Sequence, residues 1–312
     1  MTKSLRSGLR KAKASPNFAA YLCLFAVCIF WGTTWVVSSY TVRQGVTAMQ
    51  IASIRQLIAG TLICVALLIY NKGKIELAPW KDTVLLAILN FVFSNGVSTW
   101  GVQYIPAGLA SVIGATYPIW VVIIYFLFFN KKISKQVWFG LVVSFLGLLS
   151  VFYPSLSQAE FKENFMFGLG LSIFSTITWS IGTIYTKNQT QKKINPYFSI
   201  GLQMILSGII ITTIQYFNNS LVPLSDIPIG VYYGIIYLTI FGSIIAFCCF
   251  IYALKNLPAE QVSVYAYINP IVAMVLSNIF LGEKITLLIV IGSLVVLGGI
   301  YILNKAFKKE VI

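Results

Sequence analysis

The chain has 312 residues, of which 58% are hydrophobic and 10% are charged, and it carries a formal net charge of +14. Soluble domains carry about 25% charged residues, so this composition excludes an ordinary soluble protein and indicates a membrane protein. The apolar runs, such as residues 121–124 and 209–211, lack the period-two alternation of a transmembrane β-barrel. They therefore predict helices.

Charge-free stretches set the number of predicted helices, because about 20 apolar residues cross the hydrocarbon of a bilayer as a helix. Each stretch fits one crossing, except that residues 83–130 fit two, and the crossing that ends near residue 70 has to include Arg55. In chain order the predicted helices span residues 18–39, 48–70, 82–103, 107–129, 136–153, 167–187, 197–217, 230–252, 259–281 and 285–303. The predicted fold class is an all-α integral membrane protein with ten transmembrane helices.

The basic segment 1–17 precedes an apolar run, as in a secretory signal. Because the run is long and nine more follow it, we expect a retained first helix and a cytoplasmic N-terminus over residues 1–17. All five cysteines fall inside predicted helices, and the chain has no histidine. An odd number of thiols in apolar surroundings argues against a disulfide framework and against zinc, so we expect no metal and no cofactor.

The basic residues segregate by loop, as the cytoplasmic preference of Lys and Arg requires. If the N-terminus lies inside, 18 of the 22 basic residues fall in cytoplasmic segments, and only Arg43, Lys162 and Lys284 lie outside, with Arg55 inside a helix. Both termini, including residues 304–312, are then cytoplasmic. Topology accounts for the net charge, so we expect the lipid bilayer and a small-molecule substrate as partners and no nucleic acid. A homodimer stays open.

The chain also aligns with itself. Residues 105–118 and 257–270 share five residues at an offset of 152, among them both pairs of prolines. The same offset brings Gly140 onto Gly292 and Gly147 onto Gly299, and an offset of 148 brings Trp31 onto Trp179 and Arg55 onto Gln203.

These matches predict two five-helix repeats, residues 18–153 and 167–303, joined by a periplasmic linker over 154–166. Since five is an odd number, the second repeat enters the membrane upside down. Inverted repeats of this kind give two structures of similar energy, each open to one side of the membrane, and so predict a transporter that works by alternating access.

Pro118 and Pro270 are expected deep inside the fourth and ninth helices. Proline there removes a hydrogen bond from the carbonyl four residues earlier, which belongs to Gly114 and Ala266 respectively. In lipid a freed carbonyl needs a partner or a water-filled cavity. We therefore expect both prolines to act as hinges in a cavity wall; a packing kink without a role in transport is the alternative.

Short motifs occur in the order and at the spacing of a known family. They are Phe30-Trp31-Gly32, Arg55, Pro106-Ala107, Trp179, Pro258-Ala259, Asn269-Pro270 and Leu281-Gly282-Glu283. With them, nearly the whole chain resembles the drug/metabolite transporter superfamily, and specifically its bacterial EamA-type members. The chain departs from the family where Asn130-Lys131 replaces a Gly-Glu pair before the fifth helix.

The resemblance implies an inner-membrane carrier that exports small metabolites, such as amino acids, or drugs, through a central cavity whose walls include the fourth and ninth helices. It does not imply a particular substrate.

Arg55 is the only ionisable residue well inside a predicted helix. Centring arginine in a bilayer costs about 2.5–3.5 kcal/mol on insertion scales, so such residues usually face a cavity or a partner. Our hypothesis is a fixed positive charge that holds a substrate carboxylate. The alternative is a side chain that reaches the outer headgroups.

Aromatic and amide side chains complete the candidate site. Aromatic rings can hold a ring or a cation, although they also form interfacial belts, and amides can line a pore or bond neighbouring helices. The predicted substrate-binding set is Trp31, Arg55, Asn95, Trp100, Tyr117, Trp179, Gln203, Tyr267 and Asn269, with Trp35 and Tyr265 as further aromatic candidates.

All eight acidic residues map to loops, termini or helix ends, with Glu260 and Glu283 nearest to a helix core. Proton-driven carriers commonly bury such groups as relays, so our hypothesis is facilitated or weakly coupled transport. A membrane enzyme would need a nucleophile with a base, or a metal cluster, and a channel would need filter rings. A lipid flippase on the same fold stays open, whereas a phosphate-sugar carrier would bury more than one basic residue.

Overall fold

The computed structural model describes residues 16–73, 75–129, 134–157, 164–189, 194–257, 262 and 265–311. Several features singled out in the sequence lie outside these residues: the basic segment up to residue 15, Lys131, most of the linker over 158–163, and Pro258 to Glu260.

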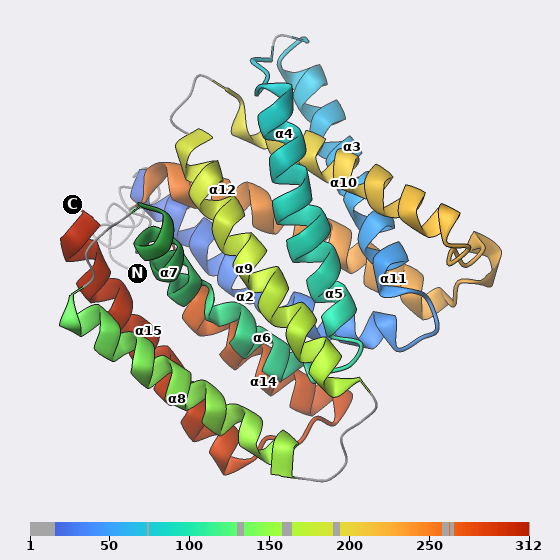
Figure 1. Ribbon diagram of the computed structural model, residues 1–312. Coiled ribbons are helices and arrows are strands. Elements are labelled where there is room, and N and C mark those ends of the chain that lie inside the picture. The colour runs from blue at the N-terminus through green and yellow to red at the C-terminus, as the bar shows by residue number, and fades with distance from the viewer. Residues whose placement is uncertain are drawn as a thin grey trace, which may run out of the picture.

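The regular structure of the described residues is helical (Figure 1). In the first half the elements are α2 (Pro16–Val42), α3 (Ala48–Tyr70), α4 (Trp80–Leu86), η1 (Ala87–Gly96), α5 (Val97–Gly101), α6 (Ala107–Ala115), α7 (Tyr117–Phe129) and α8 (Lys135–Ser157). In the second half they are α9 (Phe165–Gln189), α10 (Pro196–Phe217), η2 (Leu224–Asp226), α11 (Ile229–Tyr237), η3 (Leu238–Ile245), α12 (Ala246–Asn256), α14 (Tyr265–Leu281) and α15 (Leu287–Val311).

Within the described residues, seven helices are long and apolar enough to cross a membrane. Three shorter apolar helices, Lys135–Val151, Tyr265–Leu281 and Leu287–Leu303, lie where the sequence predicts the remaining crossings. The all-helical, multi-pass character is therefore confirmed, and the number of ten crossings stays a prediction.

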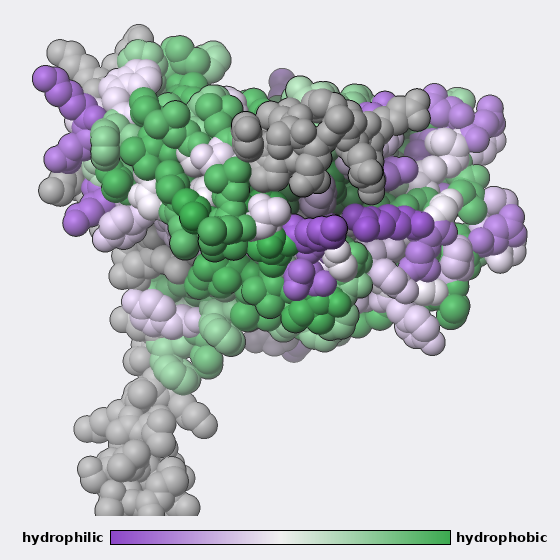
Figure 2. Space-filling view, turned by 90° about the horizontal axis from the view of Figure 1, so that it is seen from below, coloured by the Kyte–Doolittle hydropathy of each residue, from purple (hydrophilic) through white to green (hydrophobic). Residues whose placement is uncertain are grey.

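The surface has the polarity that a lipid solvent requires. The side chains of Phe25, Phe139 and Leu294 are 65%, 61% and 61% exposed, whereas Gln56 and Ser180 are fully buried. Figure 2 shows a broad apolar field over the left and centre of this face, with hydrophilic residues at its left edge and in a band from the centre to the right. Soluble proteins rarely expose large contiguous apolar surfaces, whereas this chain exposes many large apolar side chains around a core that contains both apolar and polar residues.

The second helix of each half, α3 and α10, begins with a side-chain N-cap. The Thr47 side chain accepts a hydrogen bond from the amide of Gln50, and the Asn195 side chain accepts from Tyr197 and Phe198. Each cap satisfies backbone N–H groups that a helix start leaves unpaired. Thr47 and Asn195 are separated by the offset of 148 at which Arg55 meets Gln203.

These two helices also end alike. Lys72 and Asn219 both have a φ of +50°, and the next amide in each case, Gly73 or Ser220, donates back to the carbonyl five residues earlier. This is the Schellman pattern, in which a left-handed residue closes the helix end. The two halves therefore share their local turns as well as their residues.

Helices α8 and α15 run side by side along one edge of the molecule, with glycines at their crossing (Figure 1). A Cβ added at Gly140 would lie 2.8 Å from the carbonyl oxygen of Gly299, and one added at Gly147 would lie 2.9 Å from that of Gly292. Because Gly140 aligns with Gly292 and Gly147 with Gly299, exchanging the halves maps one contact onto the other. Interfaces around a two-fold axis have this reciprocity.

Neighbouring glycines on α15 give a matched stability test. A Cβ at Gly299 would lie 2.5 Å from the backbone nitrogen of Ser144, whereas a Cβ at Gly298 would meet nothing within 4 Å. We expect Gly299→Ala to lower the free energy of unfolding by about 1–3 kcal/mol, because overpacking forces the two backbones apart. Gly298→Ala should leave it unchanged or slightly higher. Thermal unfolding of both variants in detergent measures the difference, and equal melting temperatures would contradict this packing.

Candidate functional site

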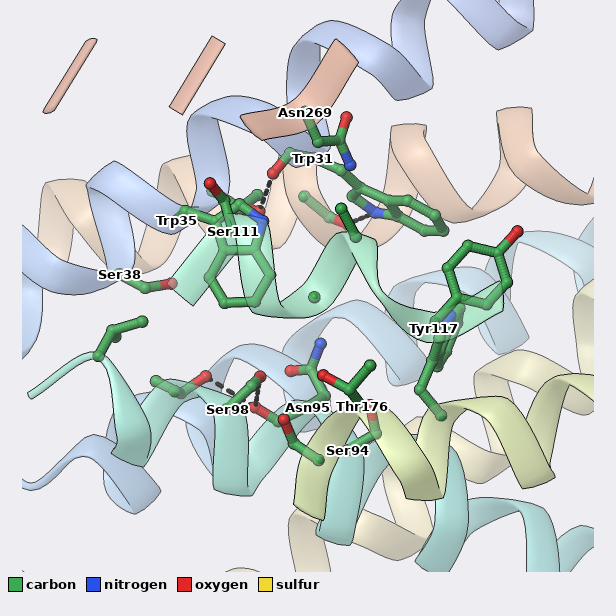
Figure 3. A pocket seen from close by; sticks show the side chains of 18 of the residues that line it. Trp31, Trp35, Ser38, Ser94, Asn95, Ser98, Ser111, Tyr117, Thr176 and Asn269 are labelled. Carbon is green, nitrogen blue, oxygen red and sulfur yellow. Dashed lines mark hydrogen bonds between the residues drawn. The ribbon is translucent and has the colours of Figure 1, made fainter. Parts of the chain in front are cut away.

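A cavity of about 140 Å³ lies between the two halves, lined mainly by α2, η1, α5, α6, α9 and α14, with single residues from α3, α7, η3 and α12 (Figure 3). In this view Trp35, Ser111 and Asn269 lie on one wall, and Ser94 and Ser98 lie on the facing wall. Its lining includes one basic residue, Arg55, and no acidic residue among the described part of the chain. The described lining therefore combines polar and apolar groups with a single fixed positive charge.

The structure brings six of the nine predicted substrate-binding residues to this cavity: Trp31, Arg55, Asn95, Tyr117, Trp179 and Asn269. They come from α2, α3, η1, α7, α9 and α14, so residues far apart in the sequence meet at one place. The further candidates Trp35 and Tyr265 line it as well. Whether these residues bind substrate stays a prediction.

The other three predicted residues lie away from the cavity. Trp100 packs edge-on against Phe167, with ring centroids 5.1 Å apart. Tyr267 packs against an apolar core cluster. Gln203 is buried on α10, and its amide nitrogen donates to Ser199 at 3.0 Å. These residues are candidates in the sequence because they are polar or aromatic within predicted helices. In the structure they lie on helix faces that do not line the cavity.

Arg55 is buried, with 5% of its surface exposed. Its Nη2 donates to Oδ1 of Asn95 on η1, and its Nε is buried without a partner. No described acidic residue forms a salt bridge with it. A buried charge is costly unless it is paired, so a guanidinium that lines a cavity and pairs with no described carboxylate is suited to an anionic ligand.

Asn95 is held in one orientation by its neighbours. Its Oδ1 accepts from Arg55 and, at 3.4 Å, from Nε2 of Gln56. Gln56 is held in turn by the carbonyl of Phe91 and by the hydroxyl of Ser207 on α10. Because the oxygen of Asn95 is used in this way, its amide nitrogen is left to donate into the cavity.

Aromatic rings form one end of the cavity. Trp31 packs edge-on against Trp179 and Tyr265, at centroid distances of 6.0 and 5.0 Å, and Tyr117 stacks on Tyr265 at 5.9 Å. The Trp31 indole N–H donates to the carbonyl of Gly242, and that of Trp179 donates to the hydroxyl of Tyr265. With both indole N–H groups bonded to protein, these rings offer mainly their apolar faces.

Hydroxyl groups line the rest of the cavity, and the sequence analysis missed them. Six of the eight serine and threonine residues in the lining donate to a backbone carbonyl of their own helix: Thr34, Ser98, Thr99, Ser111, Ser175 and Thr176. A hydroxyl has one hydrogen and two lone pairs, so these groups present acceptors to the cavity. Single serines in apolar helices are too common to reveal this from sequence.

The amide nitrogen of Asn269 makes hydrogen bonds within the protein. With the nitrogen placed toward its neighbours, it donates to the carbonyls of Cys28 on α2 and Tyr265 on α14, at 2.8 and 3.1 Å. Asn269 thus connects the first and ninth predicted helices next to the cavity.

The two expected hinge prolines differ in structure. The predicted helix over 107–129 is divided, since α6 ends at Ala115, Thr116 adopts a φ of −76° and a ψ of 0°, and α7 then begins with Tyr117-Pro118. Pro270 instead lies inside α14, which continues through it. The helix is thus divided next to Pro118 and continuous through Pro270, and the hinge role of both prolines stays a prediction. Gly114 and Ala266, whose carbonyls the prolines affect, both line the cavity.

Two π-helical segments, which the sequence analysis did not predict, lie in the third helix of each half. They are η1, which supplies Ser94 and Asn95 to the cavity, and η3, which supplies Gly242. Such wide turns are rare and frequently occur at functional sites. Clusters of Asn, Ser, Thr and Gly in both segments were the available signal.

Comparison with known proteins matches this architecture. The model of the EamA-like transporter family matches residues 18–153 and 166–305. The chain is 25% identical over 300 residues to the uncharacterized transporter YvbV of Bacillus subtilis (strain 168), covering 96% of this chain and 95% of that protein. It is 27% identical over 283 residues to the uncharacterized inner membrane transporter YedA of Escherichia coli (strain K12), covering 89% of this chain and 87% of that protein.

An uncharacterized transporter of Archaeoglobus fulgidus is 29% identical over 291 residues, covering 91% of this chain and 98% of that protein. A solved crystal structure superposes with a TM-score of 0.67 at 15% identity, covering 93% of this chain and 98% of that one, and so shares the fold. The family match extends over most of the chain, and the chain therefore belongs to the EamA-like transporter family.

Proposed function

We propose that this protein is an inner-membrane exporter that carries a small carboxylate-bearing metabolite, such as an amino acid, by alternating access through the cavity around Arg55. The observation that carries the proposal is the buried guanidinium of Arg55, which lies in the wall of a cavity between the two halves and pairs with no described acidic residue.

Inverted repeats would supply the two states that alternating access needs. Three observations support them: the family model matches each half separately, α3 and α10 have equivalent caps and ends, and the glycine contacts between α8 and α15 are reciprocal. With ten crossings, the two copies span the membrane in opposite directions.

The chemistry of the cavity favours a zwitterion. Arg55 and the amide nitrogen of Asn95 are donors for a carboxylate, and the hydroxyl oxygens and aromatic faces suit an ammonium group. An apolar side group fits the end formed by Trp31, Trp179 and Tyr265. A cavity of about 140 Å³ is far smaller than a phospholipid, which disfavours the flippase alternative.

The first prediction concerns the carboxylate. In uptake assays with everted vesicles, whose cytoplasmic face meets the medium, a panel of candidate amino acids is supplied outside the vesicles. We expect Arg55→Ala to lower kcat/KM for the transported one about 10- to 150-fold, because a hydrogen bond to a charged group contributes about 1.5–3 kcal/mol. Gln203→Ala is the matched control, since Gln203 occupies the equivalent place in the other half but lies away from the cavity. Normal transport by a folded Arg55→Ala variant across the panel would contradict the proposal.

The second prediction concerns the inversion. Lys72 and Asn219 have the same left-handed turn at the ends of α3 and α10. In a background without native cysteines, an impermeant thiol reagent added to intact cells should label Asn219→Cys but not Lys72→Cys. After permeabilisation both should be labelled. Labelling of both positions in intact cells would mean that the second half is not inverted.

The third prediction concerns energy coupling. Since no described acidic residue lines the cavity, we expect substrate flux down its own gradient in proteoliposomes to be unchanged when the pH gradient is collapsed. Abolished flux would show proton coupling. Omitting the substrate gradient is the control, and flux should then vanish.

A further inference from the structure

Glu283 gathers four contacts at one end of the bundle. Its carboxylate accepts from the amides of Ala107 and Gly108, at 3.0 and 3.3 Å, and pairs with Arg43 at 3.2 Å. Its carbonyl accepts from the side chain of Asn278 at 3.0 Å. The Glu283 side chain is only 12% exposed, whereas that of Arg43 is 46% exposed.

The local sequence explains how Glu283 reaches these partners. Gly282, just after α14, has a φ of +65°, which glycine adopts without strain. This turn folds the chain back, so that the Glu283 amide donates to the carbonyl of Ser277. The carboxylate is thereby placed at the start of α6, where unpaired N–H groups and the helix dipole favour a negative charge.

The elements that Glu283 joins are walls of the central cavity. Arg43 follows α2, the two amides begin α6, and Glu283 itself follows α14. The same three helices supply Ser38, Ser111 and Asn269 to the lining. Ser38 lies five residues before Arg43 and Ser111 lies four residues after Ala107, which places the carboxylate about 6–8 Å beyond the cavity at 1.5 Å per residue.

The contact is one-sided. At the offset of 152 the counterpart of Glu283 in the first half is Lys131, outside the described residues. A lysine ammonium has donors and no acceptor, so it has no means of accepting the amides at the start of a helix. Lys131 therefore has no chemistry with which to make the corresponding contact.

We propose that Glu283 is a gating residue for transport. In this conformation its carboxylate holds the ends of α2, α6 and α14 together and closes the cavity toward the face that topology assigns to the outside. Opening to that face breaks the contacts with Arg43, Ala107 and Gly108. The inference rests on the proposed alternating access, and it names the contact that decides which face is closed.

Cysteine accessibility tests the gate without knowledge of the substrate. In a background in which the five native cysteines are replaced, Ser38→Cys places a thiol in the cavity, and an impermeant maleimide reports access from either face in right-side-out and everted vesicles. We expect Glu283→Ala to raise the labelling rate from the outer face about tenfold, since a hydrogen bond to a charged group contributes at least that factor, and to lower the rate from the inner face.

Matched variants separate the gate from a general effect of charge or folding. Glu283→Gln keeps an acceptor but loses the ion pair, and should give a smaller increase. Asp226→Ala removes an exposed carboxylate in the loop after α10, at the same end of the bundle, and should change nothing. An unchanged labelling rate in Glu283→Ala overturns the proposal.

A second experiment keeps the fold constant. Arg43→Cys with Glu283→Cys removes the ion pair, and a short bifunctional thiol reagent restores a connection between the two positions. With a reagent that links the two thiols through disulfides, we expect transport to stop when the positions are cross-linked and to return on reduction. Undiminished transport by the cross-linked protein overturns the gate. If Ser38→Cys is labelled from the same single face in every variant, the parent included, the result overturns alternating access and the gate with it.

Discussion

Hydrocarbon offers no hydrogen bond to a backbone, and most of this structure follows from that constraint. Each crossing has to be a helix that satisfies its own N–H and C=O groups. The same constraint acts on side chains: Thr34, Ser111 and Thr176 turn their hydroxyl hydrogens onto carbonyls of their own helices. Where the helical pattern changes, at η1, η3 and Thr116, the altered segment or its immediate neighbours line the central cavity.

Close approach of backbones stabilises the association of helices, which apolar surface alone does not do in lipid. Leucine gains little by leaving one apolar environment for another, so helices associate where small residues let their backbones meet. Gly140 and Gly299 do this between α8 and α15, and Gly60 approaches the carbonyl of Gly201 between α3 and α10. The two pairs join the fifth and second helices of one half to their counterparts in the other.

The sequence predicted the positions of the helices well, because charge-free length is a strong signal in a chain with few charges. It also identified Arg55, since a lone cation in an apolar helix needs a reason. The sequence did not show which side chains line the cavity, because this depends on the direction in which each one points. Gln203 and Arg55 occupy equivalent positions in the two halves, yet only Arg55 lines the cavity. The break at Thr116 was missed because one proline can either bend a helix or end it, depending on its neighbours.

The two halves share a backbone plan and differ in chemistry. Arg55 is matched by Gln203, and Glu283 by Lys131. A duplicated fold supplies a symmetric frame, and these substitutions make the frame directional, since a charge placed in one half has no mirror in the other.

The hydroxyl-lined part of the cavity wall has a consequence for how the substrate specificity of such a protein can change. Under the proposed function, a wall whose hydroxyl hydrogens are committed to the backbone would discriminate by the sign of a substrate's charge more than by its shape. Recognition of a head group common to many metabolites can then stay fixed while the ring-lined end is resized. Selectivity for the side group and affinity for the common head group would then depend on separate residues. A few substitutions around Trp31 and Tyr265 would change which compound is carried, while the head-group site around Arg55 stays the same.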